Sequence, residues 1–187
     1  MENIWPILLG TILINNLAFT KLVSIGQLAH FGDDEKEVLC IGSSAAVIMG
    51  VSTLISYLVA QVVDLGALDL LVYMLVVLLV TEGVKMVVKG RNKEMFESVK
   101  GVLPLLAANS AIFYLLIDTT AQGLEFLPML ITAVGAPIGL LFAFILYGAV
   151  RERLAVSHTP KPFKGLPILL VYAALVVLAL SGLNGIL

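Results

Sequence analysis

Six long apolar runs, separated by short polar connections, constrain the fold of this 187-residue chain more than any other feature. A bilayer core of about 30 Å needs about 20 apolar residues to be crossed as a helix. Charged residues make up 13% of the chain, about half the share of an ordinary soluble domain. The sequence therefore predicts an all-α integral membrane protein with six transmembrane helices. The expected spans are residues 4–25, 38–63, 68–88, 99–117, 124–150 and 166–187.

The eleven lysines and arginines all fall on one side of this six-span arrangement. They lie in or beside the first, third and fifth connections, whereas the second and fourth connections carry only acidic charges. Because basic loops stay in the cytoplasm, we expect both termini outside it. The same bias supports the number of spans, since one span more or fewer would scatter the basic residues over both sides.

Two of the apolar runs carry asparagines well inside them. Residues 9–19 read LGTILINNLAF and residues 101–113 read GVLPLLAANSAIF. Asn16 and Ala18 in the first passage match Asn109 and Ala111 in the second. Amides among leucines and isoleucines are costly unless something binds them. We therefore expect the first and fourth spans to be broken or half-length, as occurs where backbone lines a protected interior.

The two matching passages suggest a doubled unit within a single transmembrane domain, 1–187. Residues 1–95 and 96–187 would each hold three spans, and an odd number places two copies in opposite orientations. This is the inverted 3+3 repeat of many transporters, whose functional sites lie near the midplane at the repeat interface. The support within the chain is two identities over a short passage, and the connections differ in length.

The composition excludes several kinds of site. Cys40 is the only cysteine, so no internal disulfide can form, and no Cys/His cluster has the spacing of a metal site. The net charge of −2 offers no basic stripe for nucleic acid. No nucleophile–base pair or phosphate-binding glycine loop is present. We therefore expect no catalytic site in this chain alone.

Polar residues inside the expected spans are the candidate functional groups. Glu82 is the one acid inside a span, and an intramembrane carboxylate is a candidate for the path of a cation or proton. The alternative is a salt bridge to Lys85 or to Lys21. Asn16 and Asn109, similarly, either contact a cofactor or ion, or form hydrogen bonds across packed helices.

Residues 151–165, RERLAVSHTPKPFKG, resemble the fifth-connection signature of the A-type membrane subunit of Rnf complexes. The equivalent is the E-type subunit of Nqr, the sodium-pumping NADH:quinone oxidoreductase. Further passages agree in spacing, and the resemblance covers nearly the whole chain. These passages are LINN at 13–16 with a lysine five residues on, TE at 81–82, and LPLLAANSA at 103–111.

The resemblance implies a function and partners. The chain would be a membrane subunit of an ion-translocating (Na⁺ or H⁺) electron-transfer complex in a prokaryotic cytoplasmic membrane. It would pair with a homologous subunit of opposite topology, beside further membrane and peripheral redox subunits. Arg151, Glu152 and Arg153 would dock a peripheral subunit, although anchoring by positive charge also explains the arginines. Two alternatives remain open: a small ion transporter without a cluster, and a scaffold that anchors soluble redox subunits.

The resemblance also implies a [2Fe-2S] cluster shared with the partner, each subunit giving two cysteines. In this chain the two family positions hold Ser110 and Gly26, and Cys40 matches neither. Cluster irons prefer thiolate, so serine is a poor ligand and glycine is none. We therefore expect the cluster to be absent or altered here, and Asn16 and Asn109 to be remnants of its binding site.

Overall fold

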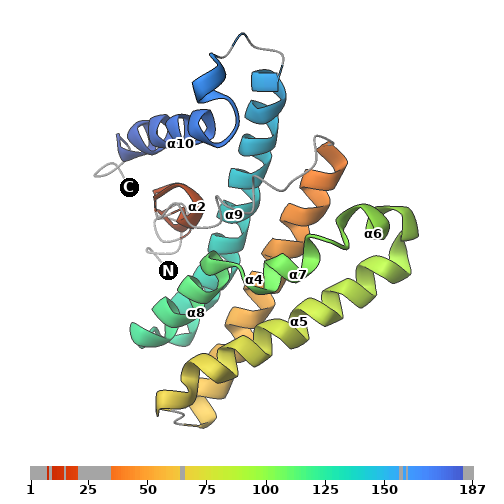
Figure 1. Ribbon diagram of the computed structural model, residues 1–187. Helices are drawn as coiled ribbons and strands as arrows, with labels where there is room; N and C mark the ends of the chain where they lie inside the picture. Colours follow the sequence, from red (N-terminus) through yellow and green to blue (C-terminus); the bar gives the residue numbers. More distant parts are fainter. Residues whose placement is uncertain are drawn as a thin grey trace.

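The computed structural model describes residues 8, 10–14, 16–20, 35–63, 66–155, 158 and 160–182, and this part of the chain is helical almost throughout (Figure 1). No strand occurs among these residues. The prediction of an all-α membrane protein is confirmed. Four helical stretches are long and apolar enough to cross a membrane, namely Lys36–Val62, Asp69–Arg91, Leu103–Ala121 and Phe126–Leu154. Shorter apolar stretches at Gly10–Phe19 and Pro167–Ser181 bring the number to six.

Two long helices, α4 (Glu35–Val62) and α9 (Phe126–Ala155), pack against each other at the centre of the molecule (Figure 1). Glycines let their backbones approach closely. A Cβ atom on Gly50 would lie 3.1 Å from the carbonyl oxygen of Ala133, and one on Gly42 would lie 2.9 Å from a leucine side chain of α9. Small residues at such contacts are typical of helices in membranes. This pair supports the remaining helices.

The first span is broken, as the buried asparagines predict. A π-helix, η1 (Gly10–Ile14), precedes Asn16, which lies outside helical structure, and α2 (Leu17–Thr20) follows. Both short helices contact α9. α2 also contacts α10 (Leu166–Ser181), the last helix (Figure 1).

The fourth span is broken as well, and both of its ends lie later in the chain than predicted. It consists of α7 (Leu103–Ala107) and α8 (Ser110–Ala121), four residues later at both ends than the predicted 99–117. The reason is that Val99 belongs to a separate short helix, α6 (Lys93–Val99). Hydropathy alone joins this valine to the apolar run, whereas Pro104 marks the first turn of α7, a position that proline favours.

The two broken spans pack reciprocally. η1 and α2, from the first half of the chain, lie against α9 from the second half, and α8 lies against α4 from the first half. Two halves related by a twofold axis would pack in this way. The division into residues 1–95 and 96–187 stays a prediction.

α5 (Asp69–Arg91) meets α4 at one end and diverges from it toward α6 (Figure 1). Its buried face consists of Tyr73, Val76, Val77 and Thr81. The helix ends three residues beyond the predicted limit of the third span, because Lys89, Gly90 and Arg91 continue it past the apolar run.

The fifth connection also begins later than expected. α9 continues to Ala155, so Arg151, Glu152 and Arg153 lie on its last turns and not in a loop. Pro137 lies inside α9 without ending it. Hydropathy placed the end of the span at Val150 because charge begins there, but a helix can continue past the edge of the apolar run.

Candidate functional site

An asparagine begins the helix that follows each break. Oδ1 of Asn16 accepts a hydrogen bond from the backbone N–H of Ala18 at 3.1 Å. Oδ1 of Asn109 accepts one from the backbone N–H of Ala111 at 2.8 Å. Asparagine is among the best N-cap residues because its side-chain oxygen satisfies an N–H group that has no partner within the helix. The two pairs that match in sequence therefore form the same local structure.

The amide group of Asn16 also joins two helices. Its Nδ2 donates to the carbonyl oxygen of Ile12 at 2.9 Å and to that of Gly139, on α9, at 2.7 Å. A Cβ atom on Gly139 would lie only 3.2 Å from this nitrogen, so glycine leaves the room that the bond needs. A hydrogen bond across packed helices was one of the two roles predicted as alternatives for Asn16. A cofactor-binding role for Asn16 and Asn109 stays a prediction.

The residues at the family's cluster positions do not fit an iron–sulfur cluster of the usual ligation. Ser110 is the exposed first residue of α8 and offers a hydroxyl. Gly26 lies outside the described residues. Cys40, the only thiol of the chain, is buried on α4. No group of three or more His, Cys, Asp or Glu side chains among the described residues is placed to hold a metal ion.

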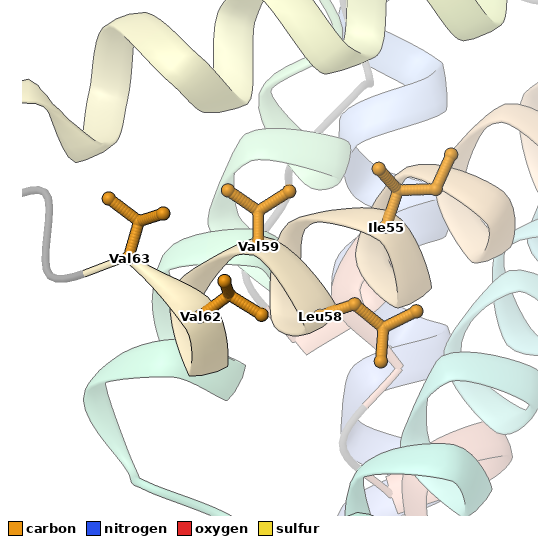
Figure 2. Close-up of a pocket in the computed structure, with 5 residues that line it drawn as sticks. All are labelled: Ile55, Leu58, Val59, Val62 and Val63. Atoms are coloured by element: carbon orange, nitrogen blue, oxygen red, sulfur yellow. The ribbon is translucent and has the colours of Figure 1, made fainter.

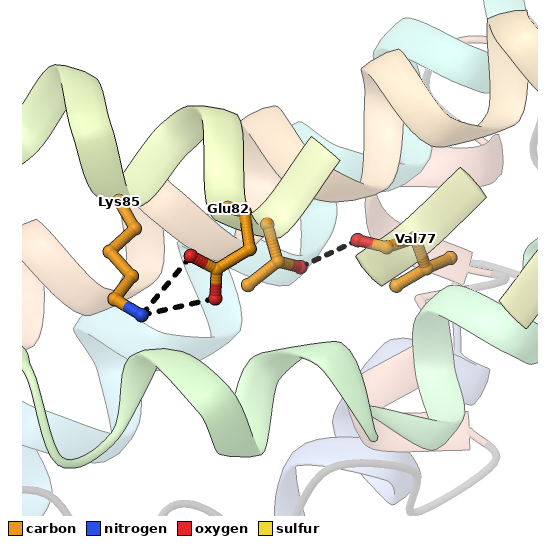
Figure 3. A network of polar contacts seen from close by, with 4 residues as sticks. Val77, Glu82 and Lys85 are labelled. Carbon is orange, nitrogen blue, oxygen red and sulfur yellow. Dashed lines mark hydrogen bonds and ion pairs between the residues drawn. The ribbon is translucent and has the colours of Figure 1, made fainter. Parts of the chain in front are cut away.

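Glu82 forms the salt bridge to Lys85 that the sequence offered as one alternative. The Nζ atom of Lys85 lies 3.0 Å from Oε1 and 3.1 Å from Oε2 of the carboxylate (Figure 3). The preceding residue, Thr81, is buried and donates to the carbonyl oxygen of Val77 at 2.7 Å. Lys21, the other expected partner, lies outside the described residues. The role of Glu82 in an ion path stays a prediction.

The depth of Glu82 makes its exposure costly. Val80 is the middle residue of the helix Asp69–Arg91. Glu82 is two residues further on, about 3 Å along the axis at 1.5 Å per residue. Its side chain is 57% exposed on the surface of the chain. A charged side chain at the centre of a membrane helix costs about 2.5–3.5 kcal/mol on insertion scales, so a carboxylate inside this span favours partners such as the ammonium group of Lys85.

Arg151, Glu152 and Arg153 lie on the last turns of α9. Arg151 is half-buried, whereas Glu152 and Arg153 are exposed. On α5, the Nζ atom of Lys89 lies 5.8 Å from the centre of the Phe96 ring of α6. Docking of a peripheral subunit by the three α9 residues stays a prediction.

An aromatic cluster near this end of α9 was not expected from the sequence. The ring of Tyr147 stacks on Phe19 of α2, with centroids 5.6 Å apart, and meets Tyr172 of α10 edge-on at 5.4 Å. The cluster fixes α2 and α10 to α9. Its members lie 25 or more residues apart in the chain, so no local pattern connects them.

An apolar hollow of about 340 Å³ lies at the end of α4 (Figure 2). Its lining consists only of aliphatic side chains, those of Ile55, Leu58, Val59, Val62 and Val63. Without a polar group it can orient no substrate, and its position on a spanning helix is that of a lipid-facing surface.

The comparisons with known proteins agree with the fold. The family described as "Rnf-Nqr subunit, membrane protein" matches residues 4–187. The A subunit of the ion-translocating oxidoreductase complex of Shewanella pealeana is 32% identical, with 96% of each chain covered. Its counterpart of the same name from Syntrophotalea carbinolica is 28% identical over 100% of this chain and 98% of its own. The A subunit of the Na⁺-translocating ferredoxin:NAD⁺ oxidoreductase complex of Acetobacterium woodii is 25% identical, with 96% and 95% covered.

Proposed function

Because the chain belongs to the Rnf-Nqr family of membrane subunits, we propose that it serves as the A-type subunit of an ion-translocating oxidoreductase complex. The observation that carries the proposal is the full-length match to relatives that are the A subunits of such complexes. In this assembly the chain pairs with a homologous subunit of opposite topology, and both termini lie outside the cytoplasm. Na⁺ is one candidate ion, since the Acetobacterium woodii complex is named for it, and H⁺ is the other.

The two asparagine-capped breaks support a transport role. Interrupted helices occur in membranes where backbone lines a protected site, typically at the interface between repeats. In the proposed mechanism, redox events elsewhere in the complex shift the two halves against each other. The ion then gains access from alternate sides, with Glu82 in its path. At the cytoplasmic end of α9, Arg151, Glu152 and Arg153 dock a peripheral redox subunit.

A second candidate function rests on Ser110. Without a thiol at this position, the usual ligand set for a [2Fe-2S] cluster is incomplete. A cluster-free paralogue that transports an ion without electron transfer through this chain is therefore the alternative. Iron analysis and electron paramagnetic resonance on the protein with its co-purifying partners separate the two. A reduced [2Fe-2S] signal from the membrane pair supports electron transfer through it, and iron-free preparations that still transport an ion support the alternative.

The chain offers a matched control for a test of Glu82. Glu97 and Lys100 of the third connection form an exposed salt bridge with the same i,i+3 spacing as Glu82 and Lys85. We expect Glu82→Gln to lower ion transport by complexes in vesicles at least tenfold, and Glu97→Gln to leave it unchanged. Equal transport by both variants would remove Glu82 from the mechanism but would leave membership of the complex intact. Failure to co-purify any redox subunit would contradict the proposed function itself.

A further inference from the structure

α5 is the least buried of the four long spans. Among its most apolar 18 residues, 22% are buried by the rest of the chain, against 50–56% in the other three. One face of α5 packs inward, and the opposite face meets nothing else in the described part of the chain closely enough to be buried. That opposite face carries Leu71, Leu75, Leu78, Glu82 and Lys85, which we call the outer stripe.

The outer stripe has the spacing of a helix–helix seam. Its members follow each other at intervals of four, three, four and three residues, which keeps them on one side of a helix. A repeat of this kind is the a/d pattern by which one helix packs along another. Leu71, Leu75 and Leu78 are 64%, 58% and 46% exposed. The side chains of Glu82 and Lys85 are 57% and 35% exposed, so the stripe is open from Leu71 to Glu82, over about three turns.

Lipid alone does not supply the hydrogen-bond donors that the carboxylate of Glu82 in the outer stripe can bind. Glu82 lies about 3 Å from the middle of α5, and its two carboxylate oxygens have about four acceptor positions. Among the described residues, one ammonium group reaches them, that of Lys85 on the same helix (Figure 3). Hydrocarbon chains donate no hydrogen bonds, and ionisable residues within membranes face protein or water far more often than lipid. The stripe therefore needs a neighbour with a polar group at this depth.

A second copy of the chain is a poor neighbour. The one-sided distribution of basic residues gives every copy the same orientation in the membrane, so two α5 helices would pack in parallel. In a parallel pair each seam residue faces its own equivalent. Glu82 would then face Glu82 and Lys85 would face Lys85, which repel each other strongly away from water.

We propose that the outer stripe is an intramembrane interface for a transmembrane helix of a different subunit. The partner helix presents a hydrogen-bond donor side chain, such as Ser, Thr, Asn, Gln, Lys or Arg, at the depth of Glu82. Leucines of the stripe pack against its apolar residues on the side away from the basic end. The inference rests on the proposed function, because it requires assembly with other membrane subunits.

Photo-crosslinking in native membranes tests the interface. A benzophenone amino acid is placed at Leu71, in the outer stripe, or at Leu70, its neighbour. The two leucines are matched in type and depth and are 64% and 58% exposed, but they point about 100° apart around the helix. We expect a covalent product from position 71 and at least tenfold less from position 70. The crosslinked peptide should be a spanning segment of another subunit with a donor residue about three turns further along, at the depth of Glu82.

Several outcomes overturn the proposal. Equal products from both positions, lipid adducts only, or a crosslink to a second copy of this chain would each do so. A second test compares Glu82→Leu with Glu97→Leu. Loss of one interhelical hydrogen bond should weaken retention of the crosslinked partner roughly 3- to 20-fold for Glu82→Leu, with no change for Glu97→Leu. Unchanged retention of the partner in the first variant would also count against the interface.

The two proposals can fail separately. If redox subunits co-purify but position 71 gives no crosslink to any of them, the proposed function stands and this interface is wrong. If position 71 captures a spanning segment of a membrane protein unrelated to redox complexes, the interface stands and the proposed function is wrong.

Discussion

The breaks in the first and fourth spans share the same local hydrogen bond but lie in different surroundings. Asn16 and Asn109 each cap the helix that follows, through the backbone N–H two residues on. After Asn16, α2 is described over Leu17–Thr20, and the asparagine amide is bonded to the carbonyl of Gly139 on α9. After Asn109 the helix α8 has twelve residues and can bury a whole face against α4.

The comparison distinguishes the local cap, which forms a break, from the contacts with other helices that stabilise it. The cap is local and requires only an asparagine before a helix. At the first break the side-chain amide of Asn16 is itself bonded to α9, and α2 packs against both α9 and α10. α8 carries its own backbone hydrogen bonds over three turns. The first break is therefore the more sensitive of the two to changes in its neighbours.

The largest effect is expected from Gly139→Val. A Cβ atom there would lie 3.0 Å from the carbonyl oxygen of Ile12 and 3.2 Å from Nδ2 of Asn16. Since neither backbone nor bonded amide yields easily, we expect a loss of about 3 kcal/mol, at the upper end for overpacking. Unfolding of the detergent-solubilised protein by denaturant measures it. Gly83→Ala is the control, because nothing lies within 4 Å of the new methyl group, and it should be neutral or slightly stabilising.

A smaller effect is expected from removal of each cap. Asn16→Ala loses the cap and the amide bond to α9, about 2 kcal/mol in all, whereas Asn109→Ala loses about 1 kcal/mol for the cap. Asn16→Ser keeps a capping oxygen without the amide donor and should fall between wild type and Asn16→Ala. The same unfolding measurement applies. Equal losses at the two breaks would show that the bond to Gly139 contributes nothing.

The smallest effect on stability is expected from Ser110→Cys. The side chain is exposed at the start of α8, so the free energy of unfolding should change by less than about 0.5 kcal/mol. One restored thiol supplies only one of the ligands that the family positions would provide, and we expect no [2Fe-2S] signal in electron paramagnetic resonance. A cluster signal in this variant, absent from wild type, would mean that Gly26 is no obstacle to cluster binding.

Much of the fold follows from local signals in the sequence. Apolar run lengths predict the helices, and Asn16 and Asn109 predict the breaks because an amide inside an apolar run is costly unless something binds it. α6 and the late end of α9 were missed, since hydropathy reports the apolar run and not the helix. Their Lys, Glu and Arg residues are good helix formers, but a reading by hydropathy does not weigh this propensity.

The candidate site was less accessible to sequence reasoning. The bond from Asn16 to Gly139 joins residues 123 positions apart, and no local pattern contains it. The Glu82–Lys85 pair was among the alternatives because i,i+3 residues meet on a helix. The exposure of Glu82 depends on where α4 leaves α5, which is a property of the tertiary structure.

The bond between Asn16 and Gly139 also sets an order of events during synthesis. Chains emerge from the ribosome at about 5–20 residues per second, so residue 139 follows residue 16 by about 6–25 s. For that interval the amide of Asn16 has no α9 carbonyl to bind. The N-terminal half therefore enters the membrane before it can adopt its final structure, and its first span is completed by the second half of the chain.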